Sequence, residues 1–334
     1  SSIGCAFGFI PINIAVMTEK QAIISILMPV KNAGPWLEEC LLSIQNQGLN
    51  QWELIAVNDH SKDKSLAILN DFKSRDERII VLDNPGNGII DALNTALNKS
   101  SGNYITRMDA DDVMPQNKLQ LFYEAVQLHP NSIVTGKVKY FSKNPVSKGY
   151  LEYEQWLNER CEKEDHWKWI YRECVIASAN WLAPKEAVAI NEGIYPEDYQ
   201  LTLKWYAEHR QIKSLKEVTH LWREHPKRTS RNSKYYQQEA FFELKLRHFL
   251  NTDRDESRPI MVMGKNQKAK LIQRFLKRQN IHYIPVDLEH LYRFAEVENP
   301  QILSAVFPDS MVRDGIVDLL SGFRLEMGRD WWWL

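Results

Sequence analysis

The chain has 334 residues, which is enough for one large and one small domain. Its 44% hydrophobic and 25% charged residues are ordinary for a soluble globular protein, and a net charge of −1 disfavours a general nucleic-acid binder. The four cysteines are scattered without metal-ligand spacing, which predicts free thiols in a reducing, cytoplasmic compartment. The sequence contains no run of about 18 apolar residues, so we expect no transmembrane helix.

The first twenty residues carry no clear element of the fold. Residues 1–16 are apolar around Pro11 and lack basic lead residues, which makes a poor signal peptide. Met17 with Thr18, Glu19 and Lys20 looks more like a true start. We therefore treat residues 1–20 as an N-terminal extension outside the fold.

Strands and helices alternate from residue 23 to residue 129. Apolar runs predict strands over 23–30, 52–57, 78–83 and 103–108, and helical spacing predicts helices over 36–47, 64–75, 89–98 and 115–129. This alternation predicts a mostly parallel sheet with helices on both faces. Ligands of such sheets bind beyond the carboxyl ends of the strands.

The alternation breaks after Pro130. The pattern then predicts strands over 132–141, 174–183 and 212–222, a helical region over 151–171, a helix opening at Pro184, and helices over 199–209 and 235–250. Residues 251–258 are polar and form a candidate linker. Beyond it, strands over 259–265, 281–286 and 302–307 and helices over 267–279 and 312–320 predict a small α/β domain, residues 259–334.

Three carboxylates follow the fourth predicted strand: Asp109, Asp111 and Asp112. Clustered anionic oxygens at a strand end repel one another unless a cation joins them, and hard oxygen ligands suit Mg²⁺ or Mn²⁺. The alternative is a solvated acidic turn in which Asp112 caps the next helix. The cluster alone does not separate these two interpretations.

Residues 23–250 resemble the family-two glycosyltransferases, whose catalytic domain has the GT-A fold. The motifs that carry the resemblance share an order and a spacing: they are Met28 to Asn32, Val57 to Asp63, Asn87-Gly88 with Ala92 to Asn94, Ser101 to Asp112, Glu197-Asp198 and Trp222 to His225. Residues 21–250 are therefore expected to form a GT-A domain that uses a nucleotide-diphospho-sugar.

The resemblance assigns a nucleotide-sugar site to the first three strand-end loops. Pro29, Val30 and Asn32 border the nucleotide, and the loop with Asn87 and Gly88 belongs to the same site. Asp59 matches the carboxylate that accepts a hydrogen bond from the base. The family usually has an Asp immediately before this carboxylate, but this chain has Asn58, so the identity of the nucleotide base stays open. The alternative is that Asp59 only caps a helix or a turn.

The same resemblance implies a divalent cation, Mn²⁺ or Mg²⁺, at an Asp-X-Asp motif. Asp111 is the expected direct ligand, with Asp109 nearer the ribose and His225 matching a histidine that completes the metal shell in some relatives. Arg107 is typical of the family and would pair with a carboxylate or a phosphate. A structural role is the alternative for Arg107 and His225, and Glu224 is a rival ligand.

Asp198 matches the catalytic base of the family. An inverting transfer needs a carboxylate that takes the proton of the acceptor hydroxyl as its oxygen attacks the anomeric carbon. The adjacent Glu197 could tune or replace Asp198, and for either residue the alternative is an acidic helix N-terminus.

Further side chains receive candidate roles in substrate binding. Lys227, Arg228 and Arg231 could close on the diphosphate or form a solvated basic face. A sugar could stack on the tryptophans of the acceptor half, although core packing is commoner; they are Trp156, Trp167, Trp169 and Trp181.

The tail resembles a small Rossmann-like module appended to some bacterial members of the family. A dinucleotide fingerprint needs three glycines, and the turn here has Gly264 alone, so we expect no bound NAD. The closing Trp331-Trp332-Trp333 would pack the module onto the catalytic domain or a partner.

The expected function is inverting sugar transfer from a UDP-, GDP- or dTDP-sugar to a saccharide or lipid-linked acceptor during surface polysaccharide synthesis. We expect the protein to act on the cytoplasmic side, where it could attach peripherally to the inner face of the membrane. The rivals are a nucleotide-sugar-binding module without catalysis and a nucleotidyltransferase. The latter lacks the Gly-rich and Lys signature expected after the first strand.

Overall fold

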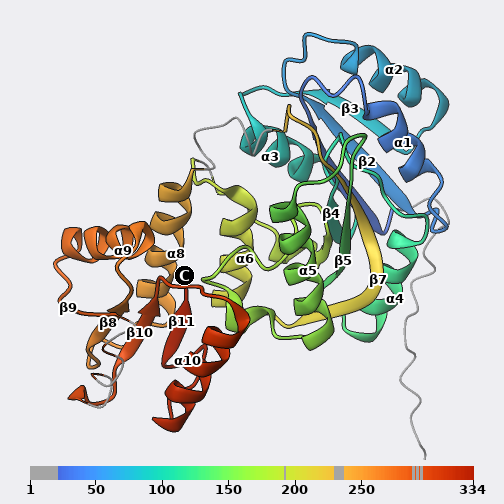
Figure 1. Cartoon of the computed structure of the whole chain (residues 1–334). Helices are drawn as coiled ribbons and strands as arrows, with labels where there is room; N and C mark the ends of the chain where they lie inside the picture. The colour runs from blue at the N-terminus through green and yellow to red at the C-terminus, as the bar shows by residue number, and fades with distance from the viewer. Residues whose placement is uncertain (1–21, 192, 229–236, 288–289, 291–292, 294–295) are drawn as a thin grey trace, which may run out of the picture.

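The computed structural model describes residues 22–191, 193–228, 237–287, 290, 293 and 296–334. Two sheets organise these residues (Figure 1). The predicted N-terminal extension and Arg231 lie outside the described residues. Within the described part of the chain, no helix has the length and apolar character needed to cross a membrane.

The larger sheet has the strand order β3-β2-β1-β4-β6-β5-β7. Its strands are β1 (Ile24–Val30), β2 (Trp52–Asn58), β3 (Ile79–Asp83), β4 (Tyr104–Arg107), β5 (Ile133–Phe141), β6 (Trp181–Pro184) and β7 (Ile212–Arg223). Pairs of neighbouring strands are parallel except where β6 runs antiparallel to β4 and β5. The prediction of a mostly parallel α/β sheet is confirmed.

Helices cover both faces of this sheet (Figure 1). They are α1 (Leu37–Gln45), α2 (Ser65–Arg75), α3 (Ile89–Lys99), α4 (Lys118–Leu128), α5 (Lys148–Lys163), α6 (Glu197–Ala207) and α8 (Gln238–Thr252), with 3₁₀ turns η1 (His166–Trp169) and η2 (Lys185–Ala187). Because side chains alternate along a strand, Ile26 and Met28 of β1 pack with residues of α1, α2 and α4, whereas Leu27 packs with α3.

Three predicted boundaries are wrong. The strand expected over 174–183 begins at Trp181, and Pro184 precedes a single 3₁₀ turn instead of a helix. Apart from Ser178, the run from Cys174 to Ala179 is apolar and buried, but its backbone forms turns, such as the one closed by the bond from Asn180 N–H to the Ala177 carbonyl at 3.0 Å. The expected linker 251–258 starts inside α8, which ends at Thr252.

The smaller sheet is parallel, in the order β11-β10-β8-β9. Its elements are β8 (Ile260–Met263), α9 (Gln267–Arg278), β9 (Tyr283–Val286), β10 (Gln301–Ser304), α10 (Ser310–Gly322) and β11 (Trp331–Trp333). Trp332 packs edge-on against Phe249 of α8 and Tyr171, with ring centroids 5.0 Å and 6.4 Å apart. The tryptophan triplet therefore lies in β11, where Trp332 joins the two sheets through a shared core, while Trp331 and Trp333 pack with α10 in the core of the smaller sheet.

Candidate active site

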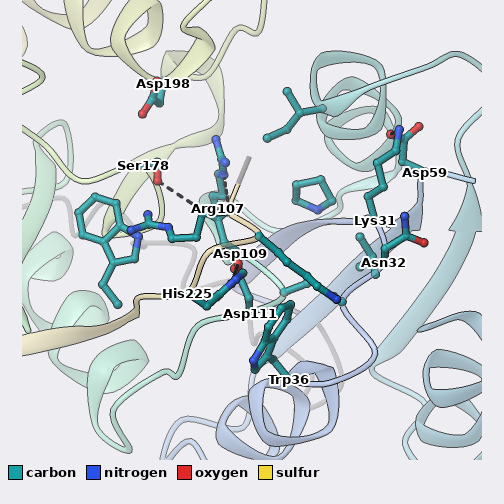
Figure 2. A pocket seen from close by; sticks show the side chains of 18 of the residues that line it. Lys31, Asn32, Trp36, Asp59, Arg107, Asp109, Asp111, Ser178, Asp198 and His225 are labelled. Atoms are coloured by element: carbon teal, nitrogen blue, oxygen red, sulfur yellow. Dashed lines mark hydrogen bonds and ion pairs between the residues drawn. The ribbon is translucent and has the colours of Figure 1, made fainter. Parts of the chain in front are cut away.

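A cavity of about 1530 Å³ opens at the carboxyl ends of β1, β2 and β4. Residues from widely separated loops line it, because the ends of parallel strands meet at one edge of a sheet. Figure 2 shows Lys31 and Asp59 on one side of this cavity, Asp198 on the other, and Asp109, Asp111 and His225 between them.

Asp59 is held by donors from two strand-end loops. Its Oδ2 accepts from Lys31 Nζ at 2.8 Å, and its Oδ1 accepts from Asn84 Nδ2 at 2.8 Å and the Gly88 N–H at 3.0 Å. Gly88 has φ +90°, where a side chain would be strained, so glycine lets its N–H reach the carboxylate. Burial favours the neutral acid, but Lys31, Gly88 and Asn84 outweigh it and lower the pKa of Asp59. A carboxylate has about four lone-pair positions, so this fixed anion keeps capacity to accept a further N–H.

Asp109 is engaged by two donors of the protein. Its Oδ1 accepts from Arg107 Nε at 2.7 Å and its Oδ2 from Ser178 Oγ at 3.3 Å. Arg107 also donates from Nη1 to Glu197 Oε1 at 3.0 Å, and both partners of that ion pair are buried. Arg107 therefore links the Asp-X-Asp motif to the start of α6.

Asp111 faces His225, with Oδ2 and Nε2 2.8 Å apart. The His225 ring stacks on Trp36 at a centroid distance of 3.8 Å, and no described residue bonds its buried Nδ1. Adjacent ligands of an octahedral ion with bonds of about 2.1 Å lie about 3.0 Å apart, so this pair fits two neighbouring positions of Mn²⁺ or Mg²⁺. The described residues contain no group of three or more His, Cys, Asp or Glu side chains placed to hold a metal. The donor set therefore suits an ion that takes further ligands from a diphosphate and water.

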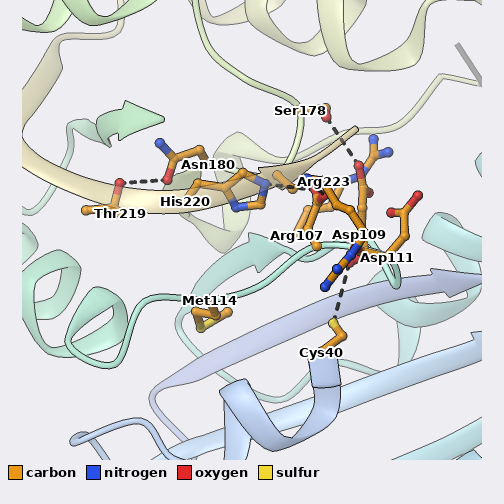
Figure 3. Close-up of polar contacts among 12 residues, drawn as sticks. Cys40, Arg107, Asp109, Asp111, Met114, Ser178, Asn180, Thr219, His220 and Arg223 are labelled. Atoms are coloured by element: carbon orange, nitrogen blue, oxygen red, sulfur yellow. Dashed lines mark hydrogen bonds and ion pairs between the residues drawn. The ribbon is translucent and has the colours of Figure 1, made fainter. Parts of the chain in front are cut away.

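Asp112 does not cap a helix. Its side chain is buried, with Oδ2 2.9 Å from His220 Nε2, and its Oδ1 accepts from the Arg223 N–H at 2.8 Å, while α4 begins only at Lys118. Figure 3 shows the polar contacts that surround this strand end. The prediction that Asp112 caps the next helix is wrong, because Asp112 fastens the loop after β4 to β7.

Asp198 and Glu197 begin α6, but they differ in surroundings. Glu197 is buried against Arg107, whereas Asp198 is half-buried at the cavity wall. Burial raises the pKa of Asp198 to about 7, the charge of Glu197 adds to the rise, and Arg107 opposes it. A carboxyl with a pKa near the working pH suits a general base.

The structure separates the other predicted residues into two groups. Pro29, Val30 and Asn32 line the cavity, as do Lys227 and Arg228, whereas Asn87 is exposed and does not. The predicted tryptophans do not line it either, since they pack in the core; these are Trp156, Trp167, Trp169 and Trp181.

Sequence reasoning missed several side chains that shape the site. Trp36 stacks on His225, and Ser178 donates to Asp109. Lys31 and Asn84 hold Asp59. Trp222 lines the cavity and stacks on Tyr140. Lys31 and Asn84 follow the ends of β1 and β3, and that position was the available signal.

The sequence of this domain was compared with models of known protein families. Residues 25–187 match the model of glycosyl transferase family 2. The chain therefore contains a family 2 glycosyltransferase domain.

Individual relatives agree with this assignment. The chain is 27% identical over 220 residues to an uncharacterized glycosyltransferase, EpsJ of Bacillus subtilis, across 61% of this chain and 62% of that protein. It is 34% identical over 133 residues to the poly(ribitol-phosphate) β-glucosyltransferase of Bacillus spizizenii, across 39% of this chain and 21% of the relative. The chain thus spans less than two thirds of the length of either relative.

A solved structure shares the fold of this glycosyltransferase domain. The mannosyltransferase PcManGT from Pyrobaculum calidifontis, solved in complex with GDP-Man and Mn²⁺, superposes with a TM-score of 0.51 at 17% identity, covering 78% of this chain and 69% of that one.

Proposed function

We propose that the protein is a metal-dependent, inverting glycosyltransferase. It takes a sugar from a nucleotide-diphospho-sugar and transfers it to a saccharide or lipid-linked saccharide of a bacterial surface polysaccharide. The observation that carries this proposal is that one cavity is lined by Asp59, by Asp111 with His225, and by Asp198. The polymer acceptor named for the Bacillus spizizenii relative supports the acceptor class.

Each group in the cavity has a separate task. Asp59, fixed as an anion by Lys31, Asn84 and Gly88, accepts an N–H of the base. Asp111 and His225 would hold Mn²⁺ or Mg²⁺, which supplies positive charge to a departing nucleoside diphosphate. Asp198 takes the proton of the acceptor hydroxyl as its oxygen attacks the anomeric carbon from the face opposite the leaving group.

The experiment that tests this function measures which product leaves the donor. Nucleotide sugars of several bases are incubated with oligosaccharide acceptors and Mn²⁺, and nucleoside diphosphate and pyrophosphate are quantified separately. Nucleoside diphosphate release that depends on acceptor, and falls at least about 100-fold in Asp198→Asn, supports the proposal. Pyrophosphate release would favour a nucleotidyltransferase, and donor binding without release of either product would favour a binding module.

A further inference from the structure

The junction of the two sheets gathers positive charge from one loop and three helices. Arg172 follows η1, Lys245 lies on α8, Lys268 lies in the first turn of α9, and Arg313 lies in the first turn of α10. Within the described residues, the one ion pair that these four cations make joins Arg172 Nη1 to Glu173 Oε2 at 3.4 Å. The cluster, which we name the junction cluster, therefore has an excess of positive charge.

Phe307 lies between the loop that carries Arg172 and the helix that carries Arg313, and contacts both side chains. The guanidinium carbons of Arg172 and Arg313 lie 4.2 Å and 4.5 Å from the centroid of its ring. Asn266, the N-cap of α9, donates from Nδ2 to the Ala305 carbonyl at 2.9 Å in the same loop. This bond fixes the start of α9, two residues before Lys268, to the loop that contains Phe307.

The junction cluster has hydrogen-bond donors that the described residues leave unused. Arg172 Nε is buried without a partner, and Lys245 Nζ gives a 3.0 Å bond to the Tyr171 carbonyl from three available protons. The side chains of Lys268 and Arg313 donate no hydrogen bond to another described residue. Burial lowers the pKa of Lys245 to about 7, Glu173 opposes this shift, and the charges of Lys268 and Arg172 add to it. An anion would relieve this repulsion and accept these bonds.

The position of the cluster relates it to the catalytic cavity. Glu173 lines that cavity together with Asp198, and Arg172 precedes it in the chain. Cys174, the next residue, lies 3.6 Å from Thr202 Oγ1 of α6, and that hydroxyl donates to the Asp198 carbonyl at 2.9 Å. The junction cluster thus borders the half of the cavity that contains the base and not the loops around Asp59.

We propose that Arg172, Lys268 and Arg313 bind a phosphate or diphosphate group of the acceptor. Several charged donors gathered at this junction suit a phosphate, because each can give a charge-assisted hydrogen bond to its oxygens. The assignment of the phosphate to the acceptor rests on the proposed function, whereas the existence of the anion site does not. It gives the smaller sheet a task, since two of the three ligands come from α9 and α10.

The test begins with binding of pyrophosphate measured by calorimetry in EDTA, without donor. The variant Lys268→Gln/Arg313→Gln should weaken pyrophosphate binding at least about tenfold, because two charged donors are lost. Its matched control, Lys270→Gln/Lys277→Gln, removes two exposed cations of α9 and should leave the affinity within about twofold. Both variants should bind nucleoside diphosphate with Mn²⁺ as the wild type does. No binding in EDTA, or equal loss in both variants, overturns the site.

A second measurement identifies the source of the phosphate. Transfer is compared for one sugar presented as its 1-phosphate and as its methyl glycoside. Lys268→Gln/Arg313→Gln should raise KM for the phosphorylated acceptor alone. An unchanged KM for both acceptors overturns the assignment to the acceptor. If the wild type transfers to neither acceptor, the proposed function fails, and the pyrophosphate titration still decides whether the anion site exists.

Discussion

The raised pKa of Asp198 makes the pH dependence of transfer predictable. A base with a pKa of about 7 is half ionised at that pH and about one tenth ionised one unit lower. At saturating Mn²⁺, kcat/KM should therefore fall about fivefold from pH 7 to pH 6. Single-turnover rates across this range, with an acceptor that does not titrate, measure the effect.

Replacing Glu197 tests the electrostatic cause. Glu197→Gln removes a negative charge that raises the pKa of Asp198, so the acidic limb should move to lower pH by roughly one unit. The control is Glu208→Gln, the same chemical change at the C-cap of the same helix. The reasoning would be refuted if the acidic limb of the wild-type pH–rate profile gave a pKa in the ordinary range of Asp, or if both variants shifted that limb equally.

Two further predictions concern the nucleotide loops and the junction of the sheets. Asn84→Ala removes the donor that bonds Asp59 at 2.8 Å and should weaken nucleoside diphosphate binding about tenfold in calorimetry, whereas Asn87→Ala, outside the cavity, should change it little. Trp332→Ala empties a core position that is 1% exposed and should lower the free energy of unfolding by about 3–5 kcal/mol in urea denaturation. Met311→Ala, at 80% exposure, serves as its control, and equal effects would contradict the shared core.

The acidic strand end was predictable because its position follows from topology. Side chains after parallel strands meet at one edge of the sheet, so Asp59 and Asp111 could be brought together from their places in the chain. The stack of Trp36 on His225 could not be predicted, because these residues are far apart in sequence and no periodic pattern relates them. The loop around Cys174 misled the strand prediction because an apolar run reports burial and not the path of the backbone.

Arg107 explains why the two halves of the site depend on each other. Its Nε bonds Asp109 and its Nη1 bonds Glu197, so one guanidinium spans the metal motif and the start of α6. Its charge opposes the pKa rise that burial and Glu197 impose on Asp198. A planar fork can make these two bonds in fixed directions, which a single ammonium on a flexible chain does not reproduce. Arg107 thus lowers the pKa of the Asp198 carboxyl and also holds Asp109, so we expect a change in either half of the site to affect the other.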